Sequence, residues 1–305
     1  MRKIIKKNLI FFLWIILSSL IGTANAYPTL SNKLTPHIVE IPGGKIEYYR
    51  FGHGTPLVLI TGYFANVKSW SYSFLKTLAT DHDVIILDNR NVGGSSNSSK
   101  KYRAIDLASD VNNLLKSLNI SHADIFGISM GGMIAQQYAI SYPQSVDHLI
   151  LMNTFIAGQQ PALPSKKIQA DFYNMPKGKF KQYLLALRVL FPPQTRAKMF
   201  FVFLHDRFNP NTVEAPLSPT VVKQQQKLVF AWIKDTYALQ KIKELKIPVL
   251  IMSGGMDYVI PSVNSDVLNK EIPHSKLIRW EDGGHAMIFQ YPVAMAKVIN
   301  DWLRN

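Results

Sequence analysis

The sequence of 305 residues contains no cysteine. Without a thiol, the chain can form no disulfide, no thiolate zinc site, no cysteine nucleophile and no lipid anchor on an N-terminal cysteine. Outside the cytoplasm its stability must therefore come from core packing alone. Hydrophobic residues make up 47% of the chain, which excludes intrinsic disorder. The length suffices for one large domain or for one domain with an insertion.

Acidic residues are also scarce, with 20 Asp and Glu against 34 Lys and Arg, a net charge of +14. The excess is uneven: residues 156–247 hold 15 basic and 5 acidic side chains, and four more basic residues lie among the first eight. The remaining chain balances at 15 against 15. No helix-turn-helix, zinc or RNP-type pattern accompanies this charge, so we expect no nucleic-acid partner.

Long hydrophobic runs are limited to one, from Leu9 to Gly22. A basic stretch precedes the run and Ala24-Asn25-Ala26 follows it, as in a secretory signal peptide (residues 1–26) cleaved after Ala26. The alternative is a retained N-terminal membrane anchor, but the run is short for the roughly 20 residues of a membrane span. We therefore expect a soluble mature chain, exported to the periplasm or secreted.

Apolar strand-like segments alternate with helical patterns up to Phe155. Ala104–Asn119 and Met130–Tyr142 have helical periodicity, and several strand segments are apolar throughout, as in a parallel sheet covered by helices on both faces. The predicted strands of this part are His37–Ile41, Ile46–Phe51, Leu57–Thr61, Val84–Asp88, Ala123–Gly127 and His148–Asn153.

The pattern changes between residues 156 and 247, where helical stretches (Phe180–Leu190, Thr220–Tyr237) occur without a clear strand. The alternation then resumes. We interpret residues 27–155 and 248–305 as two parts of one α/β core and residues 156–247 as a basic helical cap inserted between them. The predicted elements of the last part are the strands Val249–Ser253 and Lys276–Trp280 and the helices Ser262–Lys270 and Val293–Leu303.

A G-x-S-x-G motif, Gly127-Ile128-Ser129-Met130-Gly131, joins a predicted strand directly to a predicted helix. This context is typical of a nucleophile elbow, in which the serine occupies a sharp turn and the close neighbours Gly127 and Gly131 lack side chains. The alternative is a glycine-rich turn without chemistry. The context favours Ser129 as a nucleophile.

Such a serine needs a histidine base and an acid that orients it, both following the serine in the chain. Four histidines come after it. His148 lies in a predicted strand, His205 in the inserted block and His274 in a turn before a strand, whereas His285 follows the strand Lys276–Trp280. Loops at the carboxyl ends of parallel strands collect ligand chemistry, so His285 is the predicted base, although a structural turn histidine would look alike.

Asp257 is the predicted acid, because it follows the strand Val249–Ser253 at the same edge of the sheet. A helix-capping role is the alternative for Asp257. Asp266 lies inside a predicted helix, and Asp282 is too close to His285 in sequence to reach it comfortably.

The oxyanion hole is expected to consist of two backbone N–H groups. One belongs to Met130, the residue after the nucleophile. The other is assigned to Tyr63, in the loop that follows the strand ending near Ile60, where Gly62 permits the turn. The tyrosine side chain takes no part in this role.

Taken together, these segments resemble the successive blocks of the α/β-hydrolase superfamily, in its serine-nucleophile branch with esterases and lipases. The resemblance covers about Ile46 to Leu303 apart from the inserted block. It implies a mostly parallel eight-stranded sheet, a helical cap and a triad of Ser129, Asp257 and His285. The matching blocks, in the family's order, are LVLITGYF, DVIILDNRNVGGSS, DIFGISMGGMIAQQYAISYP, VDHLILMNT, IPVLIMSGGMDYVIP and DGGHAMIFQYP.

Two departures from the family pattern lie near the site. Thr61-Gly62 stands where His-Gly is common, and Asn91 replaces the first glycine of the usual D-x-R-G-x-G-x-S turn. The first lies in the loop that carries Tyr63, whereas the second affects a turn and not the chemistry. A serine at the elbow also argues against the dehalogenase and epoxide-hydrolase branches, which use aspartate there.

The predicted reaction is hydrolysis of a small-molecule carboxylic ester through an acyl-enzyme, with no cofactor and no metal. The substrate could be lipid-like, with the basic cap attracted to an anionic membrane surface, or that face could simply be solvated. The same triad also serves proline-iminopeptidase-like peptidases, C–C hydrolases and perhydrolases. A non-catalytic binding protein on the same fold is a further alternative.

Overall fold

The computed structural model describes residues 34–99, 101–173, 176–209 and 217–304. The predicted signal peptide and its cleavage site lie outside these residues. None of the helices within them is long and apolar enough to cross a membrane.

Within the described residues, nine strands form one sheet in the order β1-β2-β4-β3-β6-β7-β8-β9, with β5 paired to β2. The strands from β4 to β9 along this order run parallel, and β1, β2 and β5 pair antiparallel. This confirms the predicted mostly parallel sheet. The sheet has one strand more than predicted, because β5 has only two residues, too few to produce a periodic pattern in the sequence. The strands are β1 (His37–Ile41), β2 (Gly44–Gly52), β3 (Thr55–Ile60), β4 (His82–Leu87), β5 (Ser96–Asn97), β6 (Ala123–Ile128), β7 (Val146–Met152), β8 (Val249–Gly254) and β9 (Ser275–Trp280).

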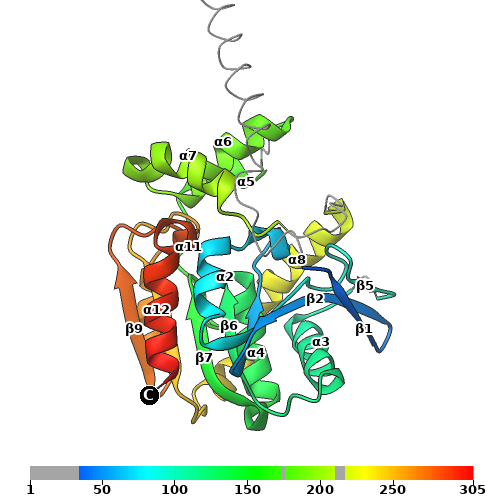
Figure 1. Ribbon diagram of the computed structural model, residues 1–305. Coiled ribbons are helices and arrows are strands. Elements are labelled where there is room, and N and C mark those ends of the chain that lie inside the picture. The colour runs from blue at the N-terminus through cyan, green and yellow to red at the C-terminus, as the bar shows by residue number, and fades with distance from the viewer. Residues whose placement is uncertain (1–33, 100, 174–175, 210–216, 305) are drawn as a thin grey trace, which may run out of the picture.

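Helices cover both faces of the sheet (Figure 1). They are α2 (Tyr72–Leu78), α3 (Ala104–Ser117), α4 (Met130–Ser141), α5 (Lys166–Tyr173), α6 (Lys179–Leu190), α7 (Arg196–His205), α8 (Pro219–Ile233), α9 (Thr236–Ile242), α10 (Val263–Glu271), α11 (Met287–Gln290) and α12 (Pro292–Leu303), with short 3-10 turns at Val67–Ser69, Pro143–Ser145 and Pro193–Thr195.

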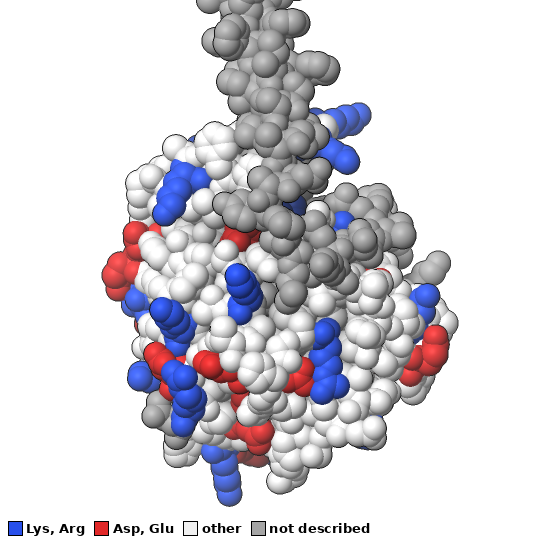
Figure 2. All heavy atoms as spheres, in the orientation of Figure 1, with Lys and Arg blue, Asp and Glu red and all other residues white. Residues whose placement is uncertain are grey.

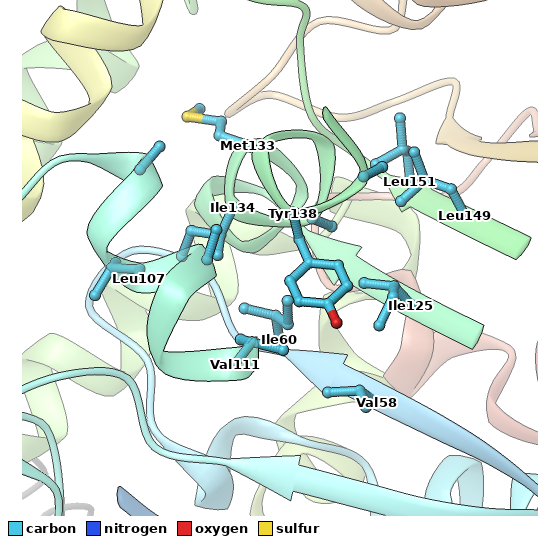
Figure 3. Close-up of a cluster of buried hydrophobic side chains, with 14 of the residues drawn as sticks. Val58, Ile60, Leu107, Val111, Ile125, Met133, Ile134, Tyr138, Leu149 and Leu151 are labelled. Atoms are coloured by element: carbon cyan, nitrogen blue, oxygen red, sulfur yellow. The ribbon is translucent and has the colours of Figure 1, made fainter. Parts of the chain in front are cut away.

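The apolar strands divide their side chains between two cores, because successive residues of a strand point to opposite faces. Val58 and Ile60 of β3 pack with α3 and α4, as Figure 3 shows around Tyr138. Leu57 and Leu59 of the same strand pack on the other face with α2, α11 and α12. A strand buried on both sides reads as a continuous apolar run, which is why these segments could be recognised in the sequence.

The inserted helices α5 to α9 connect two neighbouring parallel strands, β7 and β8. The segment predicted as one helix, Thr220–Tyr237, is in fact two, α8 and α9. The break follows from local capping: the Asp235 side chain accepts the Ala238 N–H at 2.9 Å and so begins a new helix. Trp232 and Ile242 share the core of α3 and α4, whereas α6 and α7 contribute side chains to the other core.

A histidine–aspartate pair joins β6 and β7. His148 Nδ1 lies 2.7 Å from Asp124 Oδ1, and the hydrogen bond to this carboxylate raises the pKa of His148 above 6.5. The folded state therefore binds the proton more tightly than the unfolded chain. The resulting stabilisation is fully present below pH 6.5 and is lost as the pH rises through the folded-state pKa.

We expect His148→Gln to lower the free energy of unfolding by about 1–3 kcal/mol at pH 5.5, and by less at pH 8.5. Urea unfolding at both pH values measures this. His122→Gln is the matched control, since His122 faces Asp147 at 3.3 Å on an exposed loop and should cost little. An equal loss at both pH values for His148→Gln would show that its proton is not involved.

Candidate active site

Ser129 occupies the sharp turn between β6 and α4. Its backbone has φ 57° and ψ −123°, a combination that is strained for a residue with a side chain. Backbone and side-chain bonds hold the turn: Ser129 N–H donates to the Met152 carbonyl at 2.9 Å, and Thr154 Oγ1 donates to the Ser129 carbonyl at 2.7 Å. Ser129 is half-buried, and because it directly follows β6 it lies at the carboxyl edge of the sheet.

The glycines around the turn are required by close packing. A Cβ on Gly131 would lie 2.1 Å from the Ile60 carbonyl oxygen, and one on Gly127 would lie 2.3 Å from the Gly131 carbonyl oxygen. A Cβ on Gly62 would lie 3.0 Å from the Ser129 Cβ and 3.5 Å from its hydroxyl oxygen. The loop after β3 therefore passes directly beside the serine.

His285 and Asp257 are in direct contact. His285 Nδ1 lies 2.7 Å from Asp257 Oδ2, and both residues are buried. The other carboxylate oxygen, Oδ1, accepts the N–H groups of Val259 at 2.7 Å and Ile260 at 2.9 Å. When Nδ1 carries the hydrogen of this bond, Nε2 is left as the acceptor and can take a proton from a hydroxyl.

Residues 152–154, at the end of β7, connect the two halves of the site. Ser129 bonds to Met152 and Thr154. Between them, Asn153 Nδ2 donates to the carbonyls of His285 at 2.9 Å and Gly284 at 3.2 Å, and its Oδ1 accepts the Gly254 N–H at 2.9 Å. Three consecutive residues therefore hold the serine turn, the histidine loop and the end of β8 together.

The other candidate histidines and acids lie elsewhere. His148 pairs with Asp124 in the sheet, His205 ends α7, and Asp266 pairs with Arg279 at 2.5 Å. Among the described residues, no three His, Asp or Glu side chains are grouped as metal ligands. The structure thus brings Asp257 and His285 into contact. The pair of His148 and Asp124 is equally short, but it lies near the amino ends of β7 and β6, at the opposite edge of the sheet from Ser129.

The two predicted oxyanion donors lie beside the serine turn. Met130 is the first residue of α4, where an N–H has no acceptor within the helix. Tyr63 follows Gly62, the residue that approaches the serine. The next N–H, of Phe64, donates to Gln225 Oε1 at 3.0 Å. Gln225 comes from α8 and is fully buried, so a helix of the inserted segment fixes the loop that carries Tyr63.

Comparison with known proteins matches residues 55–292 to the family model described as alpha/beta hydrolase fold. The chain belongs to the α/β hydrolase fold family. Its relatives are esterases, lipases and other hydrolases of this fold, which supports hydrolase activity for this chain.

Individual relatives are distant. The chain is 27% identical over 259 residues to a poly(3-hydroxyalkanoate) depolymerase of Ectopseudomonas oleovorans (83% of this chain, 85% of the relative). It is 26% identical over 291 residues to Lipase 1 of Psychrobacter immobilis (88% of each). A solved α/β hydrolase fold protein from Chitinophaga pinensis superposes with a TM-score of 0.76 at 21% identity, covering 90% of this chain and 98% of that one. This last similarity shows the shared fold.

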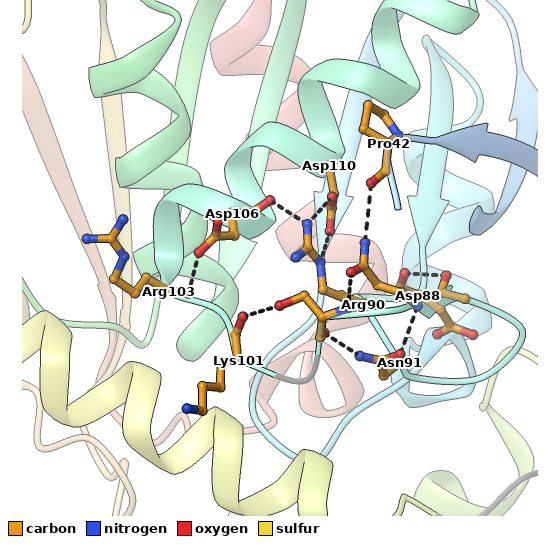
Figure 4. A network of polar contacts seen from close by, with 11 residues as sticks. Pro42, Asp88, Arg90, Asn91, Lys101, Arg103, Asp106 and Asp110 are labelled. Carbon is orange, nitrogen blue, oxygen red and sulfur yellow. Dashed lines mark hydrogen bonds and ion pairs between the residues drawn. The ribbon is translucent and has the colours of Figure 1, made fainter. Parts of the chain in front are cut away.

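Both departures of this α/β hydrolase from the family pattern have a local explanation. Asn91 has φ 62°, the left-handed conformation that favours glycine and that asparagine tolerates. Asn89 Nδ2 donates to the carbonyl and the hydroxyl of Thr61, each at 3.2 Å, so Thr61 is tied to the loop after β4. Arg90 fixes that loop on Asp110 of α3 through two bonds of 2.8 and 2.6 Å (Figure 4).

The sequence did not reveal that the Asn153 side chain connects the loops of the site. Its hydrogen bonds lead to a testable prediction. Asn153→Gly keeps the left-handed backbone (φ 46°) but removes the amide that holds the His285 loop. We expect the free energy of unfolding to fall by about 1–3 kcal/mol and, if His285 is the base as predicted, kcat to fall with little change in KM, because the imidazole is displaced. Asn264→Ala is the control: this buried asparagine ties α10 to Ala162 and should cost similar stability without changing kcat. Equal kcat in both variants would mean that Asn153 is only structural.

Proposed function

We propose that this α/β hydrolase is an exported serine hydrolase that cleaves carboxylic esters of small molecules, with the inserted helices α5 to α9 as a cap over the site. The observation that carries the proposal is the 2.7 Å contact between His285 Nδ1 and Asp257 Oδ2, held by Asn153 beside the strained turn of Ser129. A buried carboxylate that orients a histidine next to a strained serine is the arrangement of acyl-transfer enzymes.

In the proposed mechanism, Ser129 Oγ attacks the ester carbonyl while His285 Nε2 takes the hydroxyl proton. The N–H groups of Met130 and Tyr63 stabilise the oxyanion that develops. His285 then gives the proton to the leaving alcohol, and Asp257 stabilises the imidazolium that exists between these transfers. A water molecule, activated by His285, releases the acid from Ser129.

Esters are favoured over peptides by the charge of the chain. A peptidase that holds a free amino group needs acidic side chains near the site, but residues 156–247 hold only 5 acidic residues against 15 basic ones. Among the relatives, the names "Lipase 1" and "Lipase 3" favour ester substrates as well.

The substrate class can be tested with p-nitrophenyl esters of graded acyl length together with an aminoacyl p-nitroanilide. The proposal predicts turnover of the esters and none of the anilide, and the best acyl length separates a lipase from a short-chain esterase. Turnover of the anilide alone would replace the proposal by a peptidase. N-terminal sequencing of the protein recovered from its host tests export, with Tyr27 expected as the first residue.

A further inference from the structure

Two neighbouring helices, α6 and α7, expose large apolar side chains. Phe180 and Leu184 on α6 are each 42% exposed, and Phe201 and Leu204 on α7 are 50% and 47% exposed. The two residues on each helix are three or four positions apart and so lie on one face of it. The two helices pack together through the rings of Tyr183, Phe200 and Phe203, which lie beside these exposed faces. We call the exposed faces the α6–α7 surface.

Positive charge surrounds the α6–α7 surface. Residues 166–205 contain eight Lys and Arg and a single acid, Asp171, a net charge of +7. Asp171 forms an ion pair with Arg188. Six exposed lysines form no ion pair within the described part of the chain: Lys166, Lys167, Lys177, Lys179, Lys181 and Lys198. In Figure 2, blue side chains project from the upper end of the molecule, where Figure 1 places these helices, and blue and red side chains are mixed lower down.

We infer that the α6–α7 surface docks on an anionic lipid bilayer. Aromatic and aliphatic side chains among lysines are the composition of helices that lie in a membrane interface, where the apolar groups enter the acyl boundary and the lysines meet anionic headgroups. A second copy of the chain is a poor occupant, because two faces of this charge repel each other.

A groove on the same side of α6 suits a lipid headgroup. Its volume is about 390 Å³, and it is lined by Asp171, Pro176, Lys181, Leu184, Leu185 and Arg188. Asp171 and Arg188 in this groove form an ion pair with each other, so Lys181, beside Leu184 and Leu185, is the cation that would meet a phosphate while the leucines contact the first part of its acyl chains.

The α6–α7 surface is directly connected to the candidate active site. The Leu190 carbonyl at the end of α6 accepts the Ala286 N–H at 3.3 Å, one residue after His285. Phe203 of α7 packs on Phe289 of α11 with ring centroids 4.9 Å apart. Docking would thus place the site next to the bilayer and supply lipid esters to it. This link to substrate rests on the proposed function, whereas the binding itself does not.

Vesicle co-sedimentation of the Ser129→Ala protein tests the docking without turnover. Vesicles of pure phosphatidylcholine are compared with vesicles containing phosphatidylglycerol, at low and high salt. Each variant is expressed from the complete sequence, so any processing of the N-terminus is the same in all. The test variants are Lys179→Glu with Lys181→Glu, and Phe201→Ser with Leu204→Ser. The matched controls are Lys76→Glu with Lys297→Glu, and Ile38→Ser, which change exposed residues of the body.

We expect binding to the anionic vesicles that weakens with salt, and a loss of about tenfold or more in each test variant but not in the controls. Circular dichroism shows whether each variant is folded. The same substitutions are also made in the protein that keeps Ser129, where hydrolysis of a soluble ester confirms that the fold is intact. Equal binding to both vesicle types, or equal binding by test and control variants, would overturn the docking proposal. Failure of ester hydrolysis with docking intact would instead overturn the proposed function.

Discussion

Ser129→Ala is expected to lower kcat for ester hydrolysis by a factor of about 10⁴ to 10⁶, because the residue that forms the covalent intermediate is removed. The residual rate would come from substrate binding and from the N–H groups of Met130 and Tyr63, which the substitution leaves in place. Steady-state kinetics with the best p-nitrophenyl ester measures the change.

The control for this substitution is Ser117→Ala at the exposed end of α3, which should leave kcat unchanged. Circular dichroism and urea unfolding establish that both variants are folded. If Ser129→Ala keeps ester hydrolysis in a folded protein, another residue is the nucleophile.

Asp257→Asn is expected to lower kcat by about 10⁴. The Asp257 carboxylate accepts the N–H groups of Val259 and Ile260 on one oxygen and faces His285 Nδ1 with the other. An asparagine that keeps its single oxygen on the two backbone N–H groups must turn its NH₂ group toward His285. Nδ1 then becomes the acceptor, and the hydrogen moves to Nε2. The histidine can no longer take the serine proton.

Asp266→Asn is the matched control, because that carboxylate is exposed and pairs with Arg279. It should change kcat by less than about twofold, since exposed ion pairs contribute little. Both variants are compared across pH with the same ester. A kcat of Asp257→Asn within tenfold of the native value would show that Asp257 does not orient the base.

The strands of the sheet could be predicted, because the burial of a strand is reflected in the residues of that strand itself. Strands such as β3 are buried on both faces, so their segments are apolar throughout, and the order of strands and helices follows from the chain itself. Two features of the fold could not be predicted from the sequence. β5 has only two residues, and the break between α8 and α9 depends on one capping residue, Asp235, inside a continuous helical pattern.

The contact between Asp257 and His285 could also be predicted, since both residues follow parallel strands, whose carboxyl ends meet at one edge of the sheet. Asn153 and Gln225 could not. Their side chains bond to backbone groups 131 and 161 residues away, and an isolated asparagine or glutamine carries no periodic pattern that would reveal such a bond. Only Asn153 offered a local clue in the sequence, because it is a polar residue at the end of an apolar predicted strand.

Labelling with a fluorophosphonate probe tests the central claim most directly, because the probe reacts only with a serine whose proton is removed by a neighbouring base. We predict one adduct, located by peptide mass spectrometry on Ser129. It should be absent in Ser129→Ala and formed at least about a hundredfold more slowly in His285→Ala. An unlabelled Ser129 in a folded protein, or an adduct on another serine, would contradict the assignment of this site.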